Sequence, residues 1–401
     1  MDSSNPKKEN GSMRKLFLPS LAMSNFATGP LGVLVTLLLT DIAFTFEVSV
    51  GIMGQMSTIS YVVAVIFGMF MGILSVRFRH KSLLMVGLLC ATISALGCFS
   101  ASNFELMLIF YSLSGVGTAM VFPMATTLVG EHFRLEMRGN AVGWIIAAGS
   151  LSYLIGAPVI GFIANVSGWR FTLLGFAIPI SLGSLFLAFI GLPSSSLSNK
   201  HEISRGLYLE SFKEVVSNRS ALACLVGNIL RMAAFMAILI YGVSFFRQGF
   251  SVSIDFASAI VIGAALCYTL GSLAAGQLVN KFGRKTVTVV TTFSAGIFTI
   301  SFVYLPNLWL SLALFILSAW SSGMASSAAN SLSLEQAPRF RGTMMSMNSA
   351  AISLGNAVGS ALGGLVLVLL NYEVMASTLG VMGIVAAIIF YLLTVDQLHK
   401  S

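Results

Sequence analysis

Two copies of one short motif decide how this chain is organised. The first copy is Gly72-Ile73-Leu74-Ser75-Val76-Arg77-Phe78-Arg79-His80-Lys81, and the second is Gly276-Gln277-Leu278-Val279-Asn280-Lys281-Phe282-Gly283-Arg284-Lys285, 204 positions later. Each copy follows a long apolar segment, begins with glycine and ends in a basic cluster. Glycine, the first basic residue, phenylalanine and the last lysine recur at the same offset, which indicates that the chain contains a duplicated half.

The composition predicts a membrane protein. The chain is 56% hydrophobic and 9% charged, with a mean hydropathy of +0.91, which is more apolar than a soluble domain tolerates. A helix of about 20 apolar residues crosses the hydrocarbon core. We therefore predict an all-α membrane protein with twelve transmembrane helices, at 16–40, 48–75, 82–101, 104–130, 139–164, 169–192, 220–245, 254–279, 285–305, 307–333, 342–370 and 373–395.

A polar linker separates two sets of six predicted spans. We expect an N-terminal tail at 1–15, a six-helix half at 16–192, a linker at 193–219, a second six-helix half at 220–395 and a tail at 396–401. Arg138-Gly139 before the fifth span matches Arg341-Gly342 before the eleventh, at an offset of 203. Halves with the same topology are parallel and related by a pseudo-two-fold axis along the membrane normal. Within the linker, one helical face carries Tyr208, Phe212, Val215 and Val216, and both a short surface helix and a solvated linker stay open.

Lysine and arginine predict the orientation. All but three of the 22 basic residues lie in regions that share one side of the membrane, and the exceptions are Arg170, Arg231 and Arg247. Cytoplasmic loops carry the excess of these residues. We therefore expect both termini in the cytoplasm and a multi-pass protein of the plasma membrane. This bias also accounts for the net charge of +8 without a nucleic-acid partner.

The reactive side chains do not form an enzyme-like pattern. The four cysteines lie in apolar segments, without the spacing of a disulfide framework or a metal site. No cluster of His, Asp and Glu, nucleophile motif or phosphate loop lies in or beside the predicted membrane segments. We expect no enzymatic activity, no metal and no cofactor.

On these motifs the chain resembles the major facilitator superfamily over nearly its whole length. The family signature between spans two and three is Gly-x-x-x-Asp-Arg-x-Gly-Arg-Lys, with a weaker copy between spans eight and nine. The first copy here has Val76 in place of Asp and Arg79 in place of Gly, so the second copy matches better. The resemblance implies a major facilitator fold and a conformational role for Gly72, Arg77, Lys81, Gly276, Asn280, Lys281, Gly283, Arg284 and Lys285.

Three further stretches are loosely similar to the drug-efflux branch of that superfamily. Tyr111-Ser112-Leu113-Ser114-Gly115 stands where the exporters have Arg-x-x-Gln-Gly. Ala157-Pro158-Val159-Ile160-Gly161-Phe162 stands where they have Gly-Pro-x-x-Gly-Gly, and Trp169-Arg170 opens span six. Because Tyr111 replaces the arginine, the chain matches these exporters better in architecture than in chemistry.

Proton coupling is an open question at this point. The superfamily usually carries protons on a buried carboxylate, but none of the 14 acidic residues falls at the middle of a predicted span. Asp41, near the outer end of span one, is the best coupling candidate. The alternative is an outer helix end that faces water.

Arg231 is the one charge near the middle of a span, and Asn228 lies on the same helical face. A charge at this depth indicates function by default, and an arginine can hold a carboxylate or phosphate. The alternative is a structural arginine bonded to backbone carbonyls or to Asp41. The resemblance adds further candidates on the cavity-lining helices, where plain helix packing is the alternative: Asn25, Tyr111, Trp320, Asn330 and Asn348.

These observations predict a secondary transporter that moves a small organic solute by alternating access, as an efflux permease of the multidrug type. One alternative is an organic-anion transporter or facilitator that uses Arg231. An alternative of another class is a non-transporting membrane sensor or scaffold. We expect a monomer whose partners are the solute, the lipid bilayer and, if transport is coupled, protons. Neither the solute nor the direction follows from the sequence.

Overall fold

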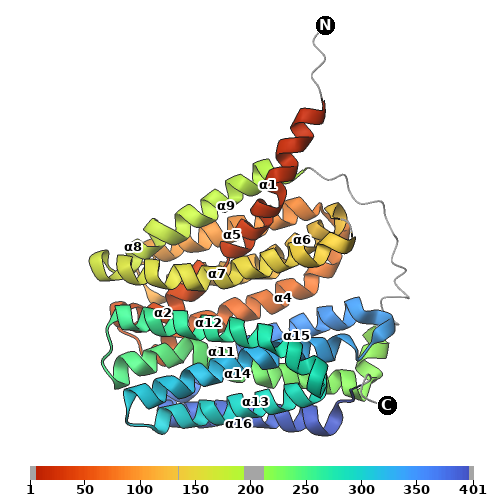
Figure 1. Cartoon of the computed structure of the whole chain (residues 1–401). Coiled ribbons are helices and arrows are strands. Elements are labelled where there is room, and N and C mark those ends of the chain that lie inside the picture. Colours follow the sequence, from red (N-terminus) through yellow and green to blue (C-terminus); the bar gives the residue numbers. More distant parts are fainter. Residues whose placement is uncertain (1–5, 134, 194–211, 397–401) are drawn as a thin grey trace. The chain divides into compact units, whose positions relative to one another are not determined.

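The computed structural model describes residues 6–133, 135–193 and 212–396, which form helices joined by short turns (Figure 1). In this part of the chain, 12 helical segments are long and apolar enough to cross a membrane. The first of them, Leu16–Thr45, is built from two consecutive helices. The prediction of an all-α protein with twelve spans is confirmed.

Contacts divide the chain into two compact units. Unit 1 comprises Met1–Leu34 and Val62–Lys200, and unit 2 comprises Val35–Tyr61 and His201–Ser401. The segment Val35–Tyr61 therefore packs with the second half of the chain, although it lies in the first half of the sequence. The halves at 16–192 and 220–395 stay a sequence-based division.

Unit 1 is a bundle whose core is formed by leucine, valine and methionine. Leu84 and Leu88 pack in one cluster with Val121 and Leu128, and all four are buried. Unit 1 includes the start of α2 (Pro30–Thr45) and most of α4 (Gln55–Arg77). Its other helices are α1 (Pro6–Phe26), α5 (His80–Ser100), α6 (Phe104–His132), α7 (Leu135–Ser167), α8 (Trp169–Thr172), the π-helix η1 (Leu173–Ala177) and α9 (Ile178–Gly191).

Unit 2 contains the rest of α2, the start of α4 and the helices that follow the linker. They are α3 (Val50–Met53), α11 (Arg219–Gly249), α12 (Ile254–Phe282), α13 (Arg284–Ser301), η2 (Phe302–Tyr304), α14 (Leu308–Leu334), η3 (Pro338–Phe340), α15 (Arg341–Leu369) and α16 (Tyr372–Leu393). A Cβ on Gly359 of α15 would lie 2.1 Å from the carbonyl oxygen of Ala233 on α11. Such backbone approach is typical of helix packing in membranes, and it brings the polar residues of α11 and α15 together.

One proline marks a break in a span, and another lies where the type of helix changes. The chain turns between α1 and α2, where Pro30 begins the new helix, and Pro179 follows the π-helix η1 near the start of α9. Pro123 and Pro158 lie inside the unbroken helices α6 and α7. The helix therefore breaks before Pro30, where proline has no N–H to continue the hydrogen-bond ladder.

The duplication is visible in the helix ends. Asn103 caps α6 and Asn307 caps α14, and each side-chain oxygen accepts hydrogen bonds from the first turn of its helix. The two positions are separated by the offset of the opening motif. This equivalence shows that the repeat extends to the turns between spans.

Part of the linker lies among the described residues. Residues 212–217 are helical, and Val215 is buried in the core of unit 2. Tyr208 lies outside the described residues. The face predicted to lie on the membrane surface therefore contributes at least one side chain to the protein core.

Large apolar side chains are exposed on both units, among them Met69, Val166, Phe186 and Leu273. An apolar surface of this extent is suited to hydrocarbon, where every backbone polar group is bonded within its own helix. Exposed phenylalanine and methionine side chains, such as Phe186 and Met69, contribute to this apolar surface.

Candidate functional site

The guanidinium of Arg231 is a buried charge in the middle part of α11. The residue is 3% exposed, and its Nε and Nη2 both donate to Asn228 Oδ1 at 3.2 Å. Asn228 precedes Arg231 by one helical turn, so the helix itself places the two side chains side by side. The contact predicted from spacing in the sequence is therefore present.

Polar side chains from two other helices extend this contact. Asn228 Nδ2 donates to Asn348 Oδ1 on α15 at 2.8 Å and to Ser333 Oγ on α14 at 3.2 Å. Asn348 Nδ2 in turn donates to Asn330 Oδ1 on α14 at 2.8 Å. Because the Asn228 amide nitrogen is used by these acceptors, its oxygen is directed to the guanidinium. We call these four residues, together with Arg231, the Arg231 cluster.

One guanidinium nitrogen of Arg231 makes no hydrogen bond to the described residues. Among the described residues, the buried Nη1 has no hydrogen-bond partner, and the ion pairs join other residues. A buried charge without compensation costs several kcal/mol. Guanidinium groups pair with carboxylates and phosphates through parallel hydrogen bonds. The Arg231 cluster can therefore accept an anionic group or another strong acceptor at Nη1.

An aromatic pair lies beside the charge. The ring of Tyr268 of α12 stacks on that of Phe235 of α11, with centroids 5.0 Å apart. Phe235 lies one turn after Arg231 on the same helix. Solute sites commonly combine apolar or aromatic walls with a few polar groups, and this arrangement has both.

A second charged group joins α2 to α11. Both carboxylate oxygens of Asp41 bond to Arg247, with Nη2 donating to Oδ1 at 2.9 Å and Nη1 donating to Oδ2. Two parallel bonds of this kind fix orientation as well as distance. The pair therefore ties the end of α2 to the end of α11 within unit 2.

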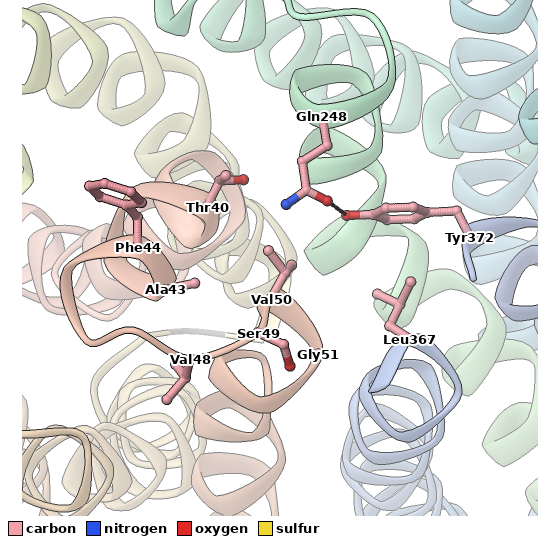
Figure 2. Close-up of a pocket in the computed structure, with 10 residues that line it drawn as sticks. All are labelled: Thr40, Ala43, Phe44, Val48, Ser49, Val50, Gly51, Gln248, Leu367 and Tyr372. Carbon is pink, nitrogen blue, oxygen red and sulfur yellow. Dashed lines mark hydrogen bonds between the residues drawn. The ribbon is translucent and has the colours of Figure 1, made fainter. Parts of the chain in front are cut away.

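Thr40 and Gln248, which are next in sequence to Asp41 and Arg247, line a cavity of about 350 Å³ (Figure 2). Tyr372 donates its hydroxyl hydrogen to Gln248 Oε1 at 2.8 Å, which leaves the amide nitrogen of Gln248 directed toward Thr40 (Figure 2). The hydroxyl of Thr40 is buried and has no partner among the described residues. The other lining residues are Ala43, Phe44, Val48, Ser49, Val50, Gly51 and Leu367.

Close contacts continue from α3 and the start of α4 to α11 and α15. Thr58 Oγ1 donates to Ser360 Oγ at 3.1 Å, and the Tyr241 hydroxyl donates to the Ser360 carbonyl oxygen at 2.9 Å. A Cβ on Gly54 would lie 2.1 Å from the Tyr241 hydroxyl oxygen. Small residues therefore let this segment pack tightly inside unit 2.

The second copy of the opening motif forms a tight turn with an ion pair. Gly283 ends α12 with φ +83°, a conformation that side chains disfavour. Arg284, the first residue of α13, pairs through Nη1 with Glu335 and donates from Nε to Ser331 Oγ at 2.8 Å. The next backbone N–H, that of Lys285, donates to Asp396 Oδ2 at 3.2 Å. This turn therefore connects α13 to α14 and to the end of the described chain.

Three other residues of the second copy are near the surface. Asn280 is exposed, and the Lys281 ammonium lies 5.2 Å from the Phe282 ring centroid. A Cβ on Gly276 would meet no heavy atom of the described residues within 4 Å. Gly276 therefore does not serve the close helix approach that a glycine in this motif suggests.

The first copy forms the equivalent turn with different residues. His80, the first residue of α5, places Nδ1 2.6 Å from Glu131 Oε1 and Nε2 3.1 Å from the carbonyl oxygen of Ser75. Lys81 donates to the last carbonyls of α9, those of Phe189 at 2.8 Å and Leu192 at 2.5 Å. A cation at a helix C-terminus is stabilised there by the helix dipole.

The first copy departs from the family signature at Val76 and Arg79. Arg79 has φ −65°, so this turn needs no glycine. Arg77 is exposed at the end of α4. Gly72 lies within α4, and the side chain of Val76 lies outside the described residues.

Residues of the types that bind metal ions do not form clusters in the described part of the chain. It contains no group of three or more His, Cys, Asp or Glu residues that could hold a metal ion. Cys98 and Cys224 are buried as free thiols, and Cys90 and Cys267 are free and half-buried.

A family model described as Major Facilitator Superfamily matches residues 20–264 and again residues 223–401. The chain belongs to the major facilitator superfamily. Multidrug resistance protein 2 of Bacillus subtilis (strain 168) is 27% identical over 311 residues, which are 72% of this chain and 73% of the relative. The uncharacterized MFS-type transporter YwfA of the same organism is 23% identical over 381 residues, 93% and 91% of the two chains.

Solved structures agree with this family. A D-xylose-proton symporter has a TM-score of 0.76 at 18% identity, covering 95% of this chain and 98% of the symporter. The nucleoside transporter NupG has a TM-score of 0.74 at 16% identity, covering 94% and 98%. At these identities the likeness shows the fold, and the predicted major facilitator fold is confirmed.

In this superfamily member, four of the predicted site residues belong to the Arg231 cluster and three do not. The four are Arg231, Asn228, Asn330 and Asn348. Trp320 precedes Asn330 by ten residues on α14, which is about 15 Å along a helix.

The other two candidates belong to unit 1. Asn25 donates from Nδ2 to the carbonyl oxygen of Ile145 at 2.7 Å, and this bond joins α1 to α7. Tyr111 is buried on α6. The geometry of Asn25 is that of a helix-packing contact, which is the alternative that the sequence left open.

The structure selects among the alternatives for two charges. Asp41 bonds to Arg247, and Arg231 bonds to Asn228, so the pairing of Arg231 with Asp41 is not formed. The sequence placed Asp41 and Arg247 on the same side of the membrane, and this signal could have paired them. Ser333 was also missed, although it lies one turn after Asn330 on the same face of α14.

Proposed function

We propose that this protein is a secondary transporter that exports a small organic solute across the plasma membrane by alternating access. Membership of the superfamily and twelve apolar spans support a transporter. The relative named Multidrug resistance protein 2 supports export of organic compounds. The observation that carries the proposal is the Arg231 cluster, a polar group with an unused donor inside a membrane-spanning bundle.

The proposed orientation has both termini in the cytoplasm. Its support is the placement of 19 basic residues, all but Arg170, Arg231 and Arg247, on one side of the predicted spans. On this orientation both copies of the opening motif lie at the cytoplasmic surface. The Asp41–Arg247 pair then lies at the outer surface.

The solute is held by the Arg231 cluster and by the aromatic pair of Phe235 and Tyr268. The amide chain of Asn228, Asn348 and Asn330 keeps the guanidinium in place, so a solute finds the donor already oriented. Preorganised donors lose less entropy on binding. Asn25, Tyr111 and Trp320 stay candidates for solute contact, and the motif residues stay candidates for control of the conformational change.

A second candidate function is organic-anion transport or facilitated diffusion through Arg231. The specific observation in its favour is that, in the described part of the chain, Arg231 Nη1 is buried without a partner and the paired carboxylates bond elsewhere. A carboxylate or phosphate of the solute would supply the missing charge. This candidate narrows the solute class without changing the fold or the site.

Asp41 is the proposed coupling residue if protons drive transport. A proton on its carboxylate would remove the charge that Arg247 pairs with, and the contact between α2 and α11 would weaken. Proton binding and separation of these helices would then occur together.

The test compares one anion with its neutral analogue. Arg231→Gln and Arg231→Lys are reconstituted in liposomes beside the unchanged protein, and uptake of labelled benzoate and benzamide is measured. If the solute is anionic, we expect Arg231→Gln to lower benzoate uptake about tenfold, the effect of losing a charged hydrogen bond, and Arg231→Lys to keep part of it. Equal losses for benzoate and benzamide would refute the anion candidate. Unchanged uptake of both by Arg231→Gln would remove Arg231 from the site.

A further inference from the structure

The two copies of the opening motif end in equivalent ion pairs, but one of them contains a histidine. His80 pairs with Glu131 in unit 1, and Arg284 pairs with Glu335 in unit 2. Both residues of each pair are related by the offset of 204 positions. In each unit the pair joins the first residue of one helix, α5 or α13, to the end of the next, at α6 or α14. We propose that His80, with Glu131, is a proton-binding site, and that its proton fixes the end of α4 against α5 and α6.

Both ring nitrogens of His80 face acceptors. Nδ1 lies 2.6 Å from a carboxylate oxygen of Glu131, and Nε2 lies 3.1 Å from the Ser75 carbonyl oxygen. A neutral imidazole has one N–H and can donate to only one of them, whereas the imidazolium donates to both. The observed geometry is therefore complete only with an extra proton held by the ring and the Glu131 carboxylate together.

The equivalent contact in unit 2 has no such requirement. Arg284 donates to Ser331 Oγ and to Glu335 from separate nitrogens of one guanidinium. Arginine keeps its charge throughout the physiological range, whereas histidine changes its charge between about pH 5 and pH 8. The duplication therefore contains one contact that holds at all these pH values and one that depends on a proton.

The charged groups around His80 leave Glu131 as its ionic partner. On α5 itself, Lys81 is directed to the carbonyls at the end of α9. On α6, His132 bonds through Nδ1 to the Leu128 carbonyl oxygen at 3.1 Å, and its ring lies 4.8 Å from that of Phe17 on α1. Arg138 of α7 donates to the Phe133 carbonyl oxygen, and Arg77 at the end of α4 and Arg79 in the turn are exposed.

The proton has access to the pair and a structural effect. The side chains of His80 and Glu131 are 14% and 26% exposed, so the ring exchanges its proton with water. Ser75 belongs to α4, His80 to α5 and Glu131 to α6, so the protonated ring connects three helix ends. Loss of the proton removes the ionic bond and one of the two hydrogen bonds, and frees the end of α4 from one neighbour.

The consequence for transport rests on the proposed function and its orientation. If the cytoplasmic ends of the helices move during transport, a contact that holds α4 there changes the rate of that step. Cytoplasmic pH would then regulate the transporter through unit 1 alone. This effect requires no proton to cross the membrane and is separate from coupling at Asp41.

The first test needs no solute. Protein labelled with ¹⁵N-histidine is placed in nanodiscs, and the His80 signals are identified by their loss in His80→Arg. We expect both ring nitrogens to be protonated near pH 5 and one to lose its proton by about pH 8, and Glu131→Gln to shift the Nδ1 signal. A ring that keeps one protonation state across this range would overturn the proposal, whether or not the protein transports anything.

The second test exchanges the two residues. Uptake is measured at equal pH on both sides of the liposome membrane, near pH 6 and near pH 8. We expect the rate to change about threefold, the effect of a partly exposed ion pair, in the unchanged protein and in His132→Gln, which removes the other histidine of this region. We expect His80→Arg to flatten the response and Arg284→His to enlarge it. A His80→Arg protein that keeps the full pH response would contradict the assignment.

Discussion

Arg231 illustrates how a buried charge depends on its neighbours. Its position on α11 follows from the sequence, and its contact with Asn228 follows from helical spacing. The contacts with α14 and α15 require the fold, because Asn330, Ser333 and Asn348 come from distant parts of the chain. A periodicity argument identifies one face of one helix, but it does not identify which faces meet.

Replacing Asn228 tests this arrangement at the residue scale. Asn228→Leu removes the oxygen that accepts both guanidinium bonds, and we expect it to lower the free energy of unfolding by about 2–4 kcal/mol, because the buried charge loses its partner. Asn228→Asp supplies a carboxylate for Arg231 but loses the bonds to Ser333 and Asn348, so it should retain more stability than Asn228→Leu while weakening binding of benzoate. Thermal unfolding in detergent and benzoate binding are the two measurements. A fully stable Asn228→Leu protein would show that Arg231 does not depend on this bond.

The two motif turns provide a matched pair of glycine and non-glycine positions. Gly283→Ala places a Cβ at φ +83°, and we expect it to cost about 1–2 kcal/mol. Arg79→Ala changes the equivalent position at φ −65°, where alanine is allowed, and should cost much less. Unfolding midpoints of the two variants measure the difference. Equal costs would mean that the turn in the second copy does not need its glycine.

At the scale of elements, the segment from α2 to the start of α4 is the main surprise. The sequence predicts its helices but assigns them to the first half, whereas the contacts group Val35–Tyr61 with unit 2. Asp41, Gly54 and Thr58 make these contacts, with Arg247, Tyr241 and Ser360 as partners. Hydropathy measures how apolar each helix is, but it does not predict which helices pack against one another.

If alternating access requires this segment to leave α15, a cross-link will stop transport. In Thr58→Cys combined with Ser360→Cys, the replaced hydroxyl oxygens are 3.1 Å apart, so we expect a disulfide after oxidation. Solute uptake should fall to the level of protein-free liposomes and return on reduction. The two single variants, treated in the same way, control for the native cysteines. Full uptake by the cross-linked protein would show that the segment stays in place during transport.

At the scale of the whole molecule, the duplication is the feature from which the fold could be predicted. The repeated motif, the number of spans and the superfamily were all predicted, because membrane spans depend on local composition and the repeat doubles each signal. The ion pairs at Glu131 and Glu335 were missed, although both acids recur at the same offset as the motif. The solute does not follow from any local sequence pattern, because the proposed site is assembled from side chains on several helices.

Counterflow in proteoliposomes tests whether this chain carries small organic solutes by alternating access. Liposomes are loaded with an unlabelled compound from a panel of organic acids and amphipathic amines, and the labelled compound is added outside. A carrier predicts transient accumulation of label above its equilibrium level for at least one compound. Time courses that match those of protein-free liposomes for every compound in the panel would contradict a carrier function for this chain.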